Sequence, residues 1–535
     1  MPTNTMGKKD EPTEQSTENP QRIGRLSIIG LALFAAVIFL LGLFTHKYEI
    51  TQFLLEERLR MREFMPHFRW WQNTSDVLVT CRIYVFSVTN RQRWLDNLDD
   101  RLKFEEIGPI TYRETLDHLD VVFHENNSTI SYNSRRQLLF MPDHNEDNIL
   151  NKTITVPNIA VLAMAAKLQR SSSLVKWAFR LILSGSGDDV FVNTTVQNYL
   201  WNMTSPVIQH AKKIVPFMVP MENIGVLNVM YQNYNDRVNV RYGKRYGHEQ
   251  FFMMNSYGSR PTVPGFIPEN GDCFASIVNA TEGAAYQQQL NEKSVLIYWR
   301  KTLCRPVPLY FEKKVHIKSL VGYKYVLLDS SYDRLANLSN DCYKGQISLL
   351  ENGMTDMSKC FTDFPVVATS PHYYARNLSA ATQISGMKPN RESHHSYIVA
   401  DPSLGIPIDQ CARTQSNLFL PKLSNFPDKI LKFSEMILPM FWIEYHQNGL
   451  PMHVLNAIEY FHLIESLQTY VPYSLYIVFV LLLVTAICKA RRYDTAFADS
   501  PIRPFGRNYK STAHCAHNST EHNKLNDNNN NNNKS

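Results

Sequence analysis

The sequence predicts an α+β domain held between two transmembrane helices, and three observations carry this prediction. Leu26–Thr45 and Val471–Cys488 are apolar runs without a charged residue, each long enough to cross most of a roughly 30 Å hydrocarbon core as a helix. Between them, period-two alternation such as Ile83-x-Val85 predicts antiparallel strands. The clearest helical pattern, Pro157–Leu183, interrupts these strands, and such mixed signals are typical of an α+β fold.

Basic residues beside the two apolar runs predict their orientation. Arg22 and Arg25 precede the first run, and three basic residues at 489–492 follow the second. Because cytosolic flanks carry the excess of Lys and Arg, we expect both tails in the cytosol. The first run exceeds the core of about 7–15 residues in a secretory signal, so we expect it to be retained. The predicted divisions are disordered cytosolic tails at 1–25 and 489–535, transmembrane helices at 26–45 and 471–488, and one extracellular domain at 46–470.

Composition and charge limit what the extracellular domain can bind. Hydrophobic residues make up 44% of the chain and aromatic residues 12%, which is ample for a core. The net charge of +6 comes mainly from the tails, because 26–488 hold 43 basic and 41 acidic residues. A nearly neutral exterior lacks the concentrated positive surface that phosphate backbones require. We therefore expect no nucleic-acid partner.

Six of the eight cysteines lie in the predicted exterior segment, where disulfides persist. An even number fits disulfides without fixing their pairing, and no CxxC or His-x₃₋₅-His spacing supports a metal site. Acceptor sequences for N-glycosylation are frequent in the same segment. The cysteines are Cys81, Cys273, Cys304, Cys342, Cys360 and Cys411, and the acceptors are Asn73, Asn126, Asn127, Asn151, Asn193, Asn202, Asn279, Asn337 and Asn377.

The helical pattern at Pro157–Leu183 reads as two short amphipathic helices separated by Ser171–Ser173 and ended by Gly185 and Gly187. Apolar side chains are expected inward, with Leu174, Ala178, Leu181 and Ile182 forming the inner stripe of the second helix. Four cations are expected outward: Lys167, Arg170, Lys176 and Arg180. Two interpretations stay open, a solvated face and a docking platform for anionic particles or lipid head groups.

Signatures of catalysis are absent from the sequence. There is no His-Glu-x-x-His, no Gly-x-x-x-x-Gly-Lys-Ser/Thr and no Gly-x-Ser-x-Gly pattern. His372 and the pair His394–His395 could serve as acid–base groups, but local hydrogen bonding at strand ends is the simpler interpretation. We therefore expect no enzyme activity, no cofactor and no metal.

Five stretches in order carry a family resemblance. They are FEEIGPITYRE at 104–114, CRPVPL at 304–309 with the following FEKKVHIKSLVGYKY, SPHYY at 370–374, SYIVADPSLG at 396–405 and LPMFWIE at 438–444. Together they resemble the class B scavenger receptor family, which includes fatty acid translocase, the lysosomal integral membrane protein and insect sensory neuron membrane proteins. The resemblance covers nearly the whole exterior segment and the topology, and leaves only the tails unmatched.

The resemblance implies an antiparallel β-barrel-like domain, a helical bundle at the tip farthest from the membrane, and an internal apolar tunnel. It implies pairing of Cys273 with Cys342 and of Cys304 with Cys360, and leaves Cys81 and Cys411 unassigned. Residues 157–183 align with the tip helices, which strengthens the docking interpretation of the four cations. One departure matters: where fatty acid translocase has a Lys-Ser-Lys-Ser-like segment, this chain has Ser184–Asp189, so ligand choice cannot be transferred.

The function expected from the resemblance is that of a plasma-membrane receptor that captures lipids or lipoprotein-like particles and passes lipid through the tunnel to the membrane. Its ligands would be fatty acids, sterol esters, carotenoids or phospholipids, and a homo-oligomer stays open. The alternative is a recognition, phagocytic or chemosensory lipid co-receptor without bulk lipid transfer. For localisation the alternative is a lysosomal or endosomal membrane, although no acidic dileucine signal is visible in the C-terminal tail.

Overall fold

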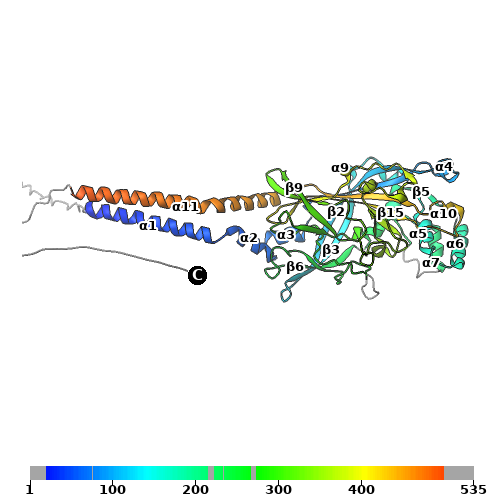
Figure 1. Ribbon diagram of the computed structural model, residues 1–535, viewed down its shortest axis with the longest axis horizontal. Coiled ribbons are helices and arrows are strands. Elements are labelled where there is room, and N and C mark those ends of the chain that lie inside the picture. Colours follow the sequence, from blue (N-terminus) through cyan, green and yellow to red (C-terminus); the bar gives the residue numbers. More distant parts are fainter. Residues whose placement is uncertain (1–19, 75, 215–221, 233, 267–272, 499–535) are drawn as a thin grey trace, which may run out of the picture. The chain divides into compact units, whose positions relative to one another are not determined.

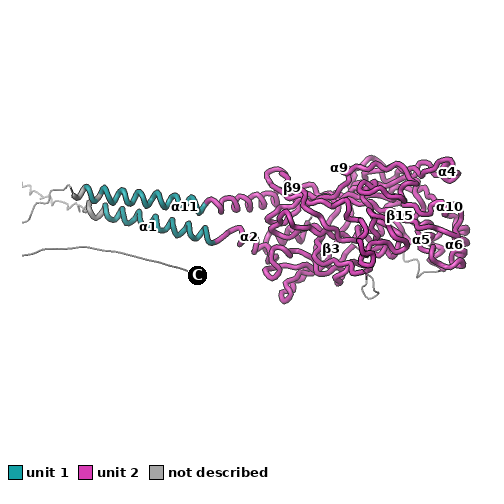
Figure 2. The backbone as a smooth tube through the Cα atoms, in the orientation of Figure 1, with its two compact units in different colours: residues 1–47, 471–535 teal, residues 48–470 magenta. Residues whose placement is uncertain are grey.

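The computed structural model describes residues 20–74, 76–214, 222–232, 234–266 and 273–498. Most of the two predicted cytosolic tails lies outside these residues. The described chain forms two compact units, one of residues 20–47 and 471–498 and one of residues 48–470 (Figure 2). The second unit contains the sheet, the cavities and the shorter helices.

The first unit consists of two apolar helices, α1 (Pro20–Lys47) and the C-terminal part of α11 (Met452–Ala498). Both are long and apolar enough to cross a membrane. They pack through rings, with the centroids of Phe39 and Phe479 4.8 Å apart. A side chain at Gly42 would place its Cβ 2.8 Å from the Tyr476 ring, so glycine permits this close approach. The predicted apolar runs thus form two paired helices.

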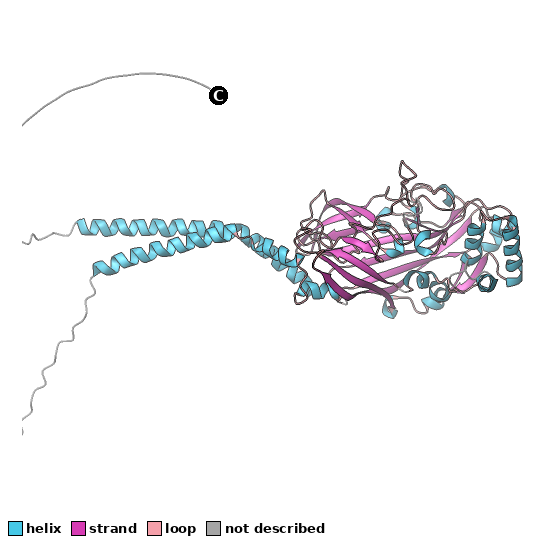
Figure 3. Cartoon of the chain, turned by 90° about the horizontal axis from the view of Figure 1, so that it is seen from below, coloured by secondary structure: helices cyan, strands magenta, loops and turns pink. Residues whose placement is uncertain are grey.

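The second unit is built on a large, mainly antiparallel sheet (Figure 3). Its strand order is β7-β6-β3-β2-β1-β16-β15-β14-β10-β9-β8. Strands β11, β12 and β13 are attached to this sheet, and β4 and β5 form a separate pair. The strands are β1 (Val79–Val88), β2 (Leu102–His124), β3 (Thr129–Phe140), β4 (Thr153–Pro157), β5 (Phe191–Thr195), β6 (Asn235–Arg241), β7 (Met254–Tyr257), β8 (Val295–Tyr298), β9 (Val307–Ile317), β10 (Leu320–Leu327), β11 (Thr355–Asp356), β12 (Val366–Thr369), β13 (Ile384–Ser385), β14 (Tyr397–Ala400), β15 (Pro407–Phe419) and β16 (Ile437–Gln447).

The centre of the sheet joins the two ends of the domain, because β1 pairs with β16. The alternating side chains Cys81, Ile83 and Val85 of β1 are fully buried, as the period-two pattern predicts. The outermost strands β7 and β8 share a partner in residues 279–281. The Met254 amide donates to the Ala280 carbonyl at 2.8 Å, and the Thr281 amide donates to the Ile297 carbonyl at 2.8 Å. This segment therefore hydrogen-bonds to both outer strands.

The shorter helices lie around the sheet. They are α2 (Ile50–Leu59), α3 (Pro66–Gln72), α4 (Arg91–Leu95), α5 (Ile159–Leu168), α6 (Ser173–Ser186), α7 (Pro206–Ile214), α8 (Val226–Tyr231), α9 (Arg391–His394) and α10 (Asp428–Leu431). Helices α5, α6 and α7 pack against one another at one end of the domain, whereas α2 and α3 lie at its other end (Figure 1). The α+β prediction is confirmed.

Helix α6 has the predicted limits but the opposite orientation. It begins after Ser172 and ends at Gly187, whose φ of 73° is left-handed and favours glycine. Most of the stripe expected to face inward is exposed: Leu174 is 72% exposed and Leu181 52%, whereas Ile182 packs against the core as predicted. Lys176 and Phe179 are buried. The prediction is therefore wrong for Leu174, Ala178 and Leu181, because the groups that cover Lys176 come from a distant loop that periodicity does not reveal.

Both disulfides implied by the resemblance are present in the structure, Cys273–Cys342 and Cys304–Cys360. Cys81 and Cys411 are free and buried. Cys81 lies on β1 and Cys411 on β15, and β16 separates these strands. Two interstrand spacings amount to about 9–10 Å, which exceeds the Cα separation of about 7 Å that a disulfide tolerates. The open question of these two thiols is thereby resolved.

Replacing Cys273 or Cys342 by Ser is expected to give the same folding defect, with the double variant no worse than either single one. Each change removes the same covalent constraint, which spans 69 residues and contributes about 4 kcal/mol in the chain-entropy model. Surface delivery and thermal unfolding of the three variants test this, with exposed Cys488→Ser as the control. Additive losses would contradict a shared bridge.

Candidate functional site

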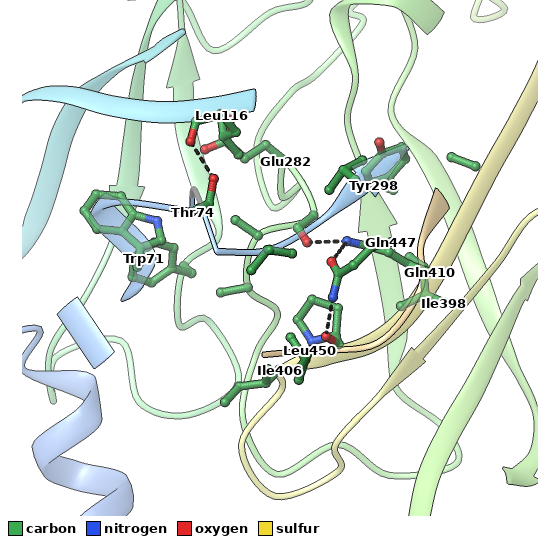
Figure 4. A pocket seen from close by; sticks show the side chains of 18 of the residues that line it. Trp71, Thr74, Leu116, Glu282, Tyr298, Ile398, Ile406, Gln410, Gln447 and Leu450 are labelled. Carbon is green, nitrogen blue, oxygen red and sulfur yellow. Dashed lines mark hydrogen bonds between the residues drawn. The ribbon is translucent and has the colours of Figure 1, made fainter. Parts of the chain in front are cut away.

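A large cavity lies inside the second unit and has a volume of about 560 Å³ (Figure 4). Volumes of about 300–1,000 Å³ are typical of small-molecule sites. Helices α2 and α3, several strands and the 452–464 part of α11 contribute its walls. Apolar side chains dominate the lining, among them Trp71, Leu309, Leu327, Tyr332, Ile398 and Leu450. The cavity has the size and lining of a site for an apolar ligand.

The cavity reaches the surface beside α2, α3 and α11. Three of its lining residues are exposed: Leu54 at 37%, Tyr460 at 65%, and Pro66. The segments that carry these residues continue in sequence into the apolar helices, since only Tyr48 and Glu49 separate α1 from α2 and α11 is one helix. The exposed lining residues therefore belong to segments that are adjacent in sequence to the two apolar helices.

Polar groups in one wall of the cavity bond to one another. Gln410 Nε2 donates to the Gly283 carbonyl at 3.1 Å and to Gln447 Oε1 at 2.8 Å, and Gln447 Nε2 donates to the Pro407 carbonyl at 3.0 Å (Figure 4). Because the polar groups of this wall already have hydrogen-bond partners, a ligand there does not need to form hydrogen bonds with them.

A buried charge network forms another wall, and sequence reasoning missed it. Glu114 accepts from Arg136 Nη1 at 3.0 Å, from Arg300, and from the Tyr231 hydroxyl at 2.6 Å. Glu282 accepts from the Tyr132 hydroxyl at 2.7 Å and the Ser134 hydroxyl at 2.6 Å, and lies 2.9 Å from His118 Nε2. The charged members of this network border the cavity and are almost wholly buried: Glu114, Glu282, Arg136 and Arg300.

The carboxylates of this network stay ionised despite their burial. Burial alone would raise the pKa of Glu114, but the charges of Arg300 and Arg136 hold that pKa below its usual value. Burial also opposes ionisation of Glu282, yet His118 and Arg136 lower its pKa to about 2. Two carboxylates thus compensate two guanidinium groups inside the domain.

A second cavity of about 130 Å³ lies beneath α5. Ala160, Ala163 and Lys167 of α5 line it together with residues of β15 and β16. The two cavities follow one another along these strands: Thr414 and Tyr445 line the first, whereas Ser416 and Phe441 line the second. Ile443, fully buried, lies on β16 between Phe441 and Tyr445 and pairs with Thr414. Since alternate residues of a strand share a face, the Ile443 side chain lies on the same side of β16 as Phe441 and Tyr445.

The four predicted cations do not form one exposed group. Lys167, Arg170 and Arg180 are exposed. Lys167 Nζ donates to the Thr362 carbonyl at 3.2 Å, and the Arg170 guanidinium donates to the Ile347 carbonyl. Arg180 has no recorded ion pair with the described residues. These three side chains could meet an anionic surface.

Lys176 is the exception, and its predicted outward orientation is wrong. It is 5% exposed, and its ammonium donates to Gln169 Oε1 at 3.3 Å and to the Ser424 carbonyl at 3.2 Å. The same ammonium lies 5.3 Å from the centroid of the Phe426 ring. Because Ser424 and Phe426 are far away in sequence, the pattern within the helix could not reveal this packing. Lys176 is therefore not available for docking.

Apolar side chains occupy the exposed face of α6 that Lys176 was expected to share. Leu174, Trp177 and Leu181 follow one another at helical spacing, and Trp177 is 53% exposed. We call these three residues together with Lys167, Arg170 and Arg180 the α5–α6 surface. It combines an exposed apolar stripe with three cations. The sequence prediction instead placed the apolar residues of this helix in the core and only the cations in solvent.

The remaining predicted residues have clear positions. All nine glycosylation acceptors are exposed. His372 is 4% exposed, with Nε2 2.7 Å from Glu106 Oε2 and Nδ1 accepting from the Lys388 amide at 3.1 Å. His394 stacks on it, and burial together with the His372 charge lowers the pKa of His394 to about 4. None of these histidines lines either cavity. Among the described residues, no cluster of His, Cys, Asp or Glu suits a metal ion.

Comparison with known proteins adds to this geometry. The model of the CD36 family matches residues 28–490. Scavenger receptor class B member 1 of Mus musculus is 23% identical over 419 residues, which cover 78% of this chain and 80% of the relative. Lysosome membrane protein 2 of Homo sapiens is 24% identical over 377 residues, which cover 70% of this chain and 75% of the relative. Lysosome membrane protein 2 of Mus musculus is likewise 24% identical, over 380 residues.

Proposed function

This chain belongs to the CD36 family, and from that membership we propose that it is a cell-surface receptor that captures lipids or lipid-bearing particles and passes lipid through its domain to the membrane. Residues 46–470 are extracellular in this proposal, and both termini are cytosolic. The observation that carries it is the large apolar cavity, which opens beside segments continuing into the apolar helices.

Capture takes place on the α5–α6 surface. Helices that lie in a membrane interface combine exposed Trp and Leu on one side with Lys and Arg beside them, as α6 does with Trp177, Leu181 and Arg180. Burial of the apolar stripe in a lipid surface lowers its free energy, and the cations are attracted electrostatically to anionic head groups. This surface supports binding of lipid-bearing particles better than binding of a soluble, fully polar partner.

Transfer then uses the two cavities. A lipid tail that crosses water loses roughly 0.8 kcal/mol for each exposed CH₂ group, so an apolar passage removes a large barrier. Lipid captured at α5 reaches the second cavity first and the large cavity after it. Passage is expected to require the Ile443 side chain to move, because Ile443 lies on β16 between residues that line the two cavities. Fatty acids, sterol esters, carotenoids and phospholipids all fit this scheme in principle.

The capture step is tested by replacing Lys167, Arg170 and Arg180 together by Gln while leaving Lys176 intact. Each cation near an anionic surface is worth about 1 kcal/mol, so capture of phosphatidylserine vesicles should fall by up to about two orders of magnitude. Capture by the parent should weaken with salt, and capture by the variant much less, because exposed charges are screened beyond about 8 Å at physiological ionic strength. Vesicle binding to cells at several salt concentrations measures both effects.

The matched control replaces three exposed cations outside this surface by Gln: Lys293, Lys313 and Lys318. It should leave capture unchanged, and both variants should reach the cell surface, since exposed substitutions barely change stability. Normal vesicle binding by the α5–α6 variant at low salt would show that the surface is merely solvated.

The separation of the two cavities favours one alternative. If the Ile443 side chain does not move aside, the domain holds lipid without passing it to the membrane. The protein is then a recognition or chemosensory lipid co-receptor. Because two of the relatives are named lysosome membrane proteins, an endosomal or lysosomal membrane is the alternative location to the plasma membrane. Blocking the large cavity separates transfer from recognition.

A further inference from the structure

Two basic side chains that line the large cavity near its exposed residues each hold one buried nitrogen with no hydrogen-bond partner among the described residues. Arg58 belongs to α2 and His67 to α3, and both line the cavity near the exposed Leu54 and Pro66. Arg58 Nη1 and His67 Nε2 are buried atoms, and neither has a hydrogen-bond partner in the described part of the chain. Leaving a guanidinium donor and an imidazole nitrogen unpaired costs free energy, and the guanidinium calls for an acceptor.

Arg58 differs from the other arginines of the cavity. Arg136 and Arg300 pair with Glu114, and Arg413 Nε lies 2.7 Å from Glu444 Oε2. No recorded ion pair joins Arg58 to a carboxylate of the described residues. Three of the four guanidinium groups in the lining therefore pair with glutamates, namely Glu114, Glu282 and Glu444, whereas Arg58 pairs with none of the described carboxylates.

The surroundings of Arg58 do not supply the missing acceptor. Asp401 attracts its charge from a distance, but the Asp401 carboxylate already bonds to His462 Nε2 and to the Leu404 amide. The Phe251 ring lies 5.2 Å from the guanidinium carbon and offers its face but no oxygen atom. Burial and the Arg58 charge lower the pKa of His67 to about 4, so its ring is neutral at pH 7. A ligand anion would meet one fixed cation and one neutral imidazole.

We propose that Arg58 and His67 bind the carboxylate of a single-chain lipid acid whose hydrocarbon chain lies in the large cavity. This rests on the proposed function, which places lipid in that cavity. A carboxylate brings one negative charge and two acceptor oxygens, which suit the planar fork of a guanidinium. Beyond the opening, Leu309, Leu327 and Ile398 offer only apolar contacts to the chain. Sterol esters and carotenoids lack an anionic group, so the site selects lipid acids over them.

The test compares palmitate with hexadecanol, which has the same chain length and no carboxylate. With the full-length receptor in nanodiscs, the parent should bind palmitate more tightly. Arg58→Gln should weaken palmitate binding about ten-fold or more, as expected for the loss of a charged hydrogen bond, and leave hexadecanol binding unchanged. Arg58→Lys, which keeps the charge, should retain most of the preference. The matched control is Arg69→Gln, because Arg69 lies on α3 beside His67 but is exposed and outside the lining.

Further arms identify the source of the anion. Hexadecyl phosphate should compete with palmitate, whereas millimolar acetate or inorganic phosphate should not, because a free anion gains nothing from the apolar cavity. If palmitate and hexadecanol bind equally well, or if Arg58→Gln binds palmitate like the parent, the head-group site is wrong while lipid binding stands. If acetate displaces palmitate, the pair is a soluble-anion site instead. If neither lipid binds, both the site and the proposed conduit fail.

Discussion

Filling the large cavity with a covalent group should stop lipid transfer while particle capture stays at the parent level. Ala457 of α11 lines the cavity close to its opening, so Ala457→Cys gives a bulky maleimide an attachment point there. In the proposed function, capture uses the α5–α6 surface, and helices α5 and α6 lie at the other end of the domain from α2 and α3 (Figure 1). Transfer of a fluorescent lipid from vesicles into cells should fall to the background rate, and vesicle binding in the cold should not change.

The control for this experiment is the neighbouring residue. Asn456 is exposed and does not line the cavity, so Asn456→Cys carries the same reagent without filling it. Both variants are made with Cys488→Ser, because Cys488 is the exposed free thiol of the described chain. Cys411 also lines the cavity, but burial raises the pKa of its thiol and keeps it unreactive. If lipid transfer continues at the parent rate when the cavity is filled, the conduit hypothesis is wrong and the recognition-receptor hypothesis takes its place.

Replacing Glu114 by Gln is expected to cost about 3–5 kcal/mol of unfolding free energy. The change removes one charge of a nearly inaccessible network, takes from Arg300 the carboxylate it pairs with, and leaves Arg136 with Glu282. Thermal unfolding of the purified receptor measures the loss. The control is Glu292→Gln, whose exposed pair with Lys314 should contribute little to stability because solvent screens it. Equal effects of the two variants would show that the network does not stabilise the fold.

The same network sets the acid limit of the fold. Folding lowers the pKa of Glu282 to about 2 from an ordinary value of about 4.3 in the unfolded chain. A lowered pKa stabilises the folded state fully above the unfolded value, and this contribution disappears as pH falls from about 4.3 towards about 2. The Glu282 contribution should therefore hold from neutral pH to about pH 4.5 before it declines, whereas the lowered pKa values of His67 and His394 should reduce total stability already below about pH 6.5. In Glu114→Gln the decline should start from a lower plateau.

Local patterns predicted the elements better than their surroundings. The apolar runs appear as α1 and α11, and the interruption at Ser171–Ser173 separates α5 from α6 as expected. The direction in which α6 faces was not predictable, because Ser424 and Phe426 hold Lys176 from a loop about 250 residues away. Periodicity finds a stripe but does not say whether a neighbouring element or solvent covers it.

The polar part of the site was hidden for a related reason. Glu114 and Glu282 each look like an ordinary surface charge within their own segments, and only the fold brings them to Arg136 and Arg300. Arg58 likewise looks like the solvated side of a short amphipathic helix, and only the cavity shows that its Nη1 is buried and unpaired. Resemblance supplied the family and both disulfide pairs, but it named none of these groups.

The pairing of β1 with β16 has a consequence for the synthesis of this protein. Arg82 on β1 and its partner Glu444 on β16 are 362 residues apart. At about 5–20 residues per second, a ribosome needs roughly 20–70 s to make the chain between them. During that time β1 can pair with β2 alone, and its other edge stays open to wrong partners. The nascent chain should therefore depend on chaperones until its last strand emerges, and truncation before β16 should leave an aggregation-prone fragment rather than a smaller receptor.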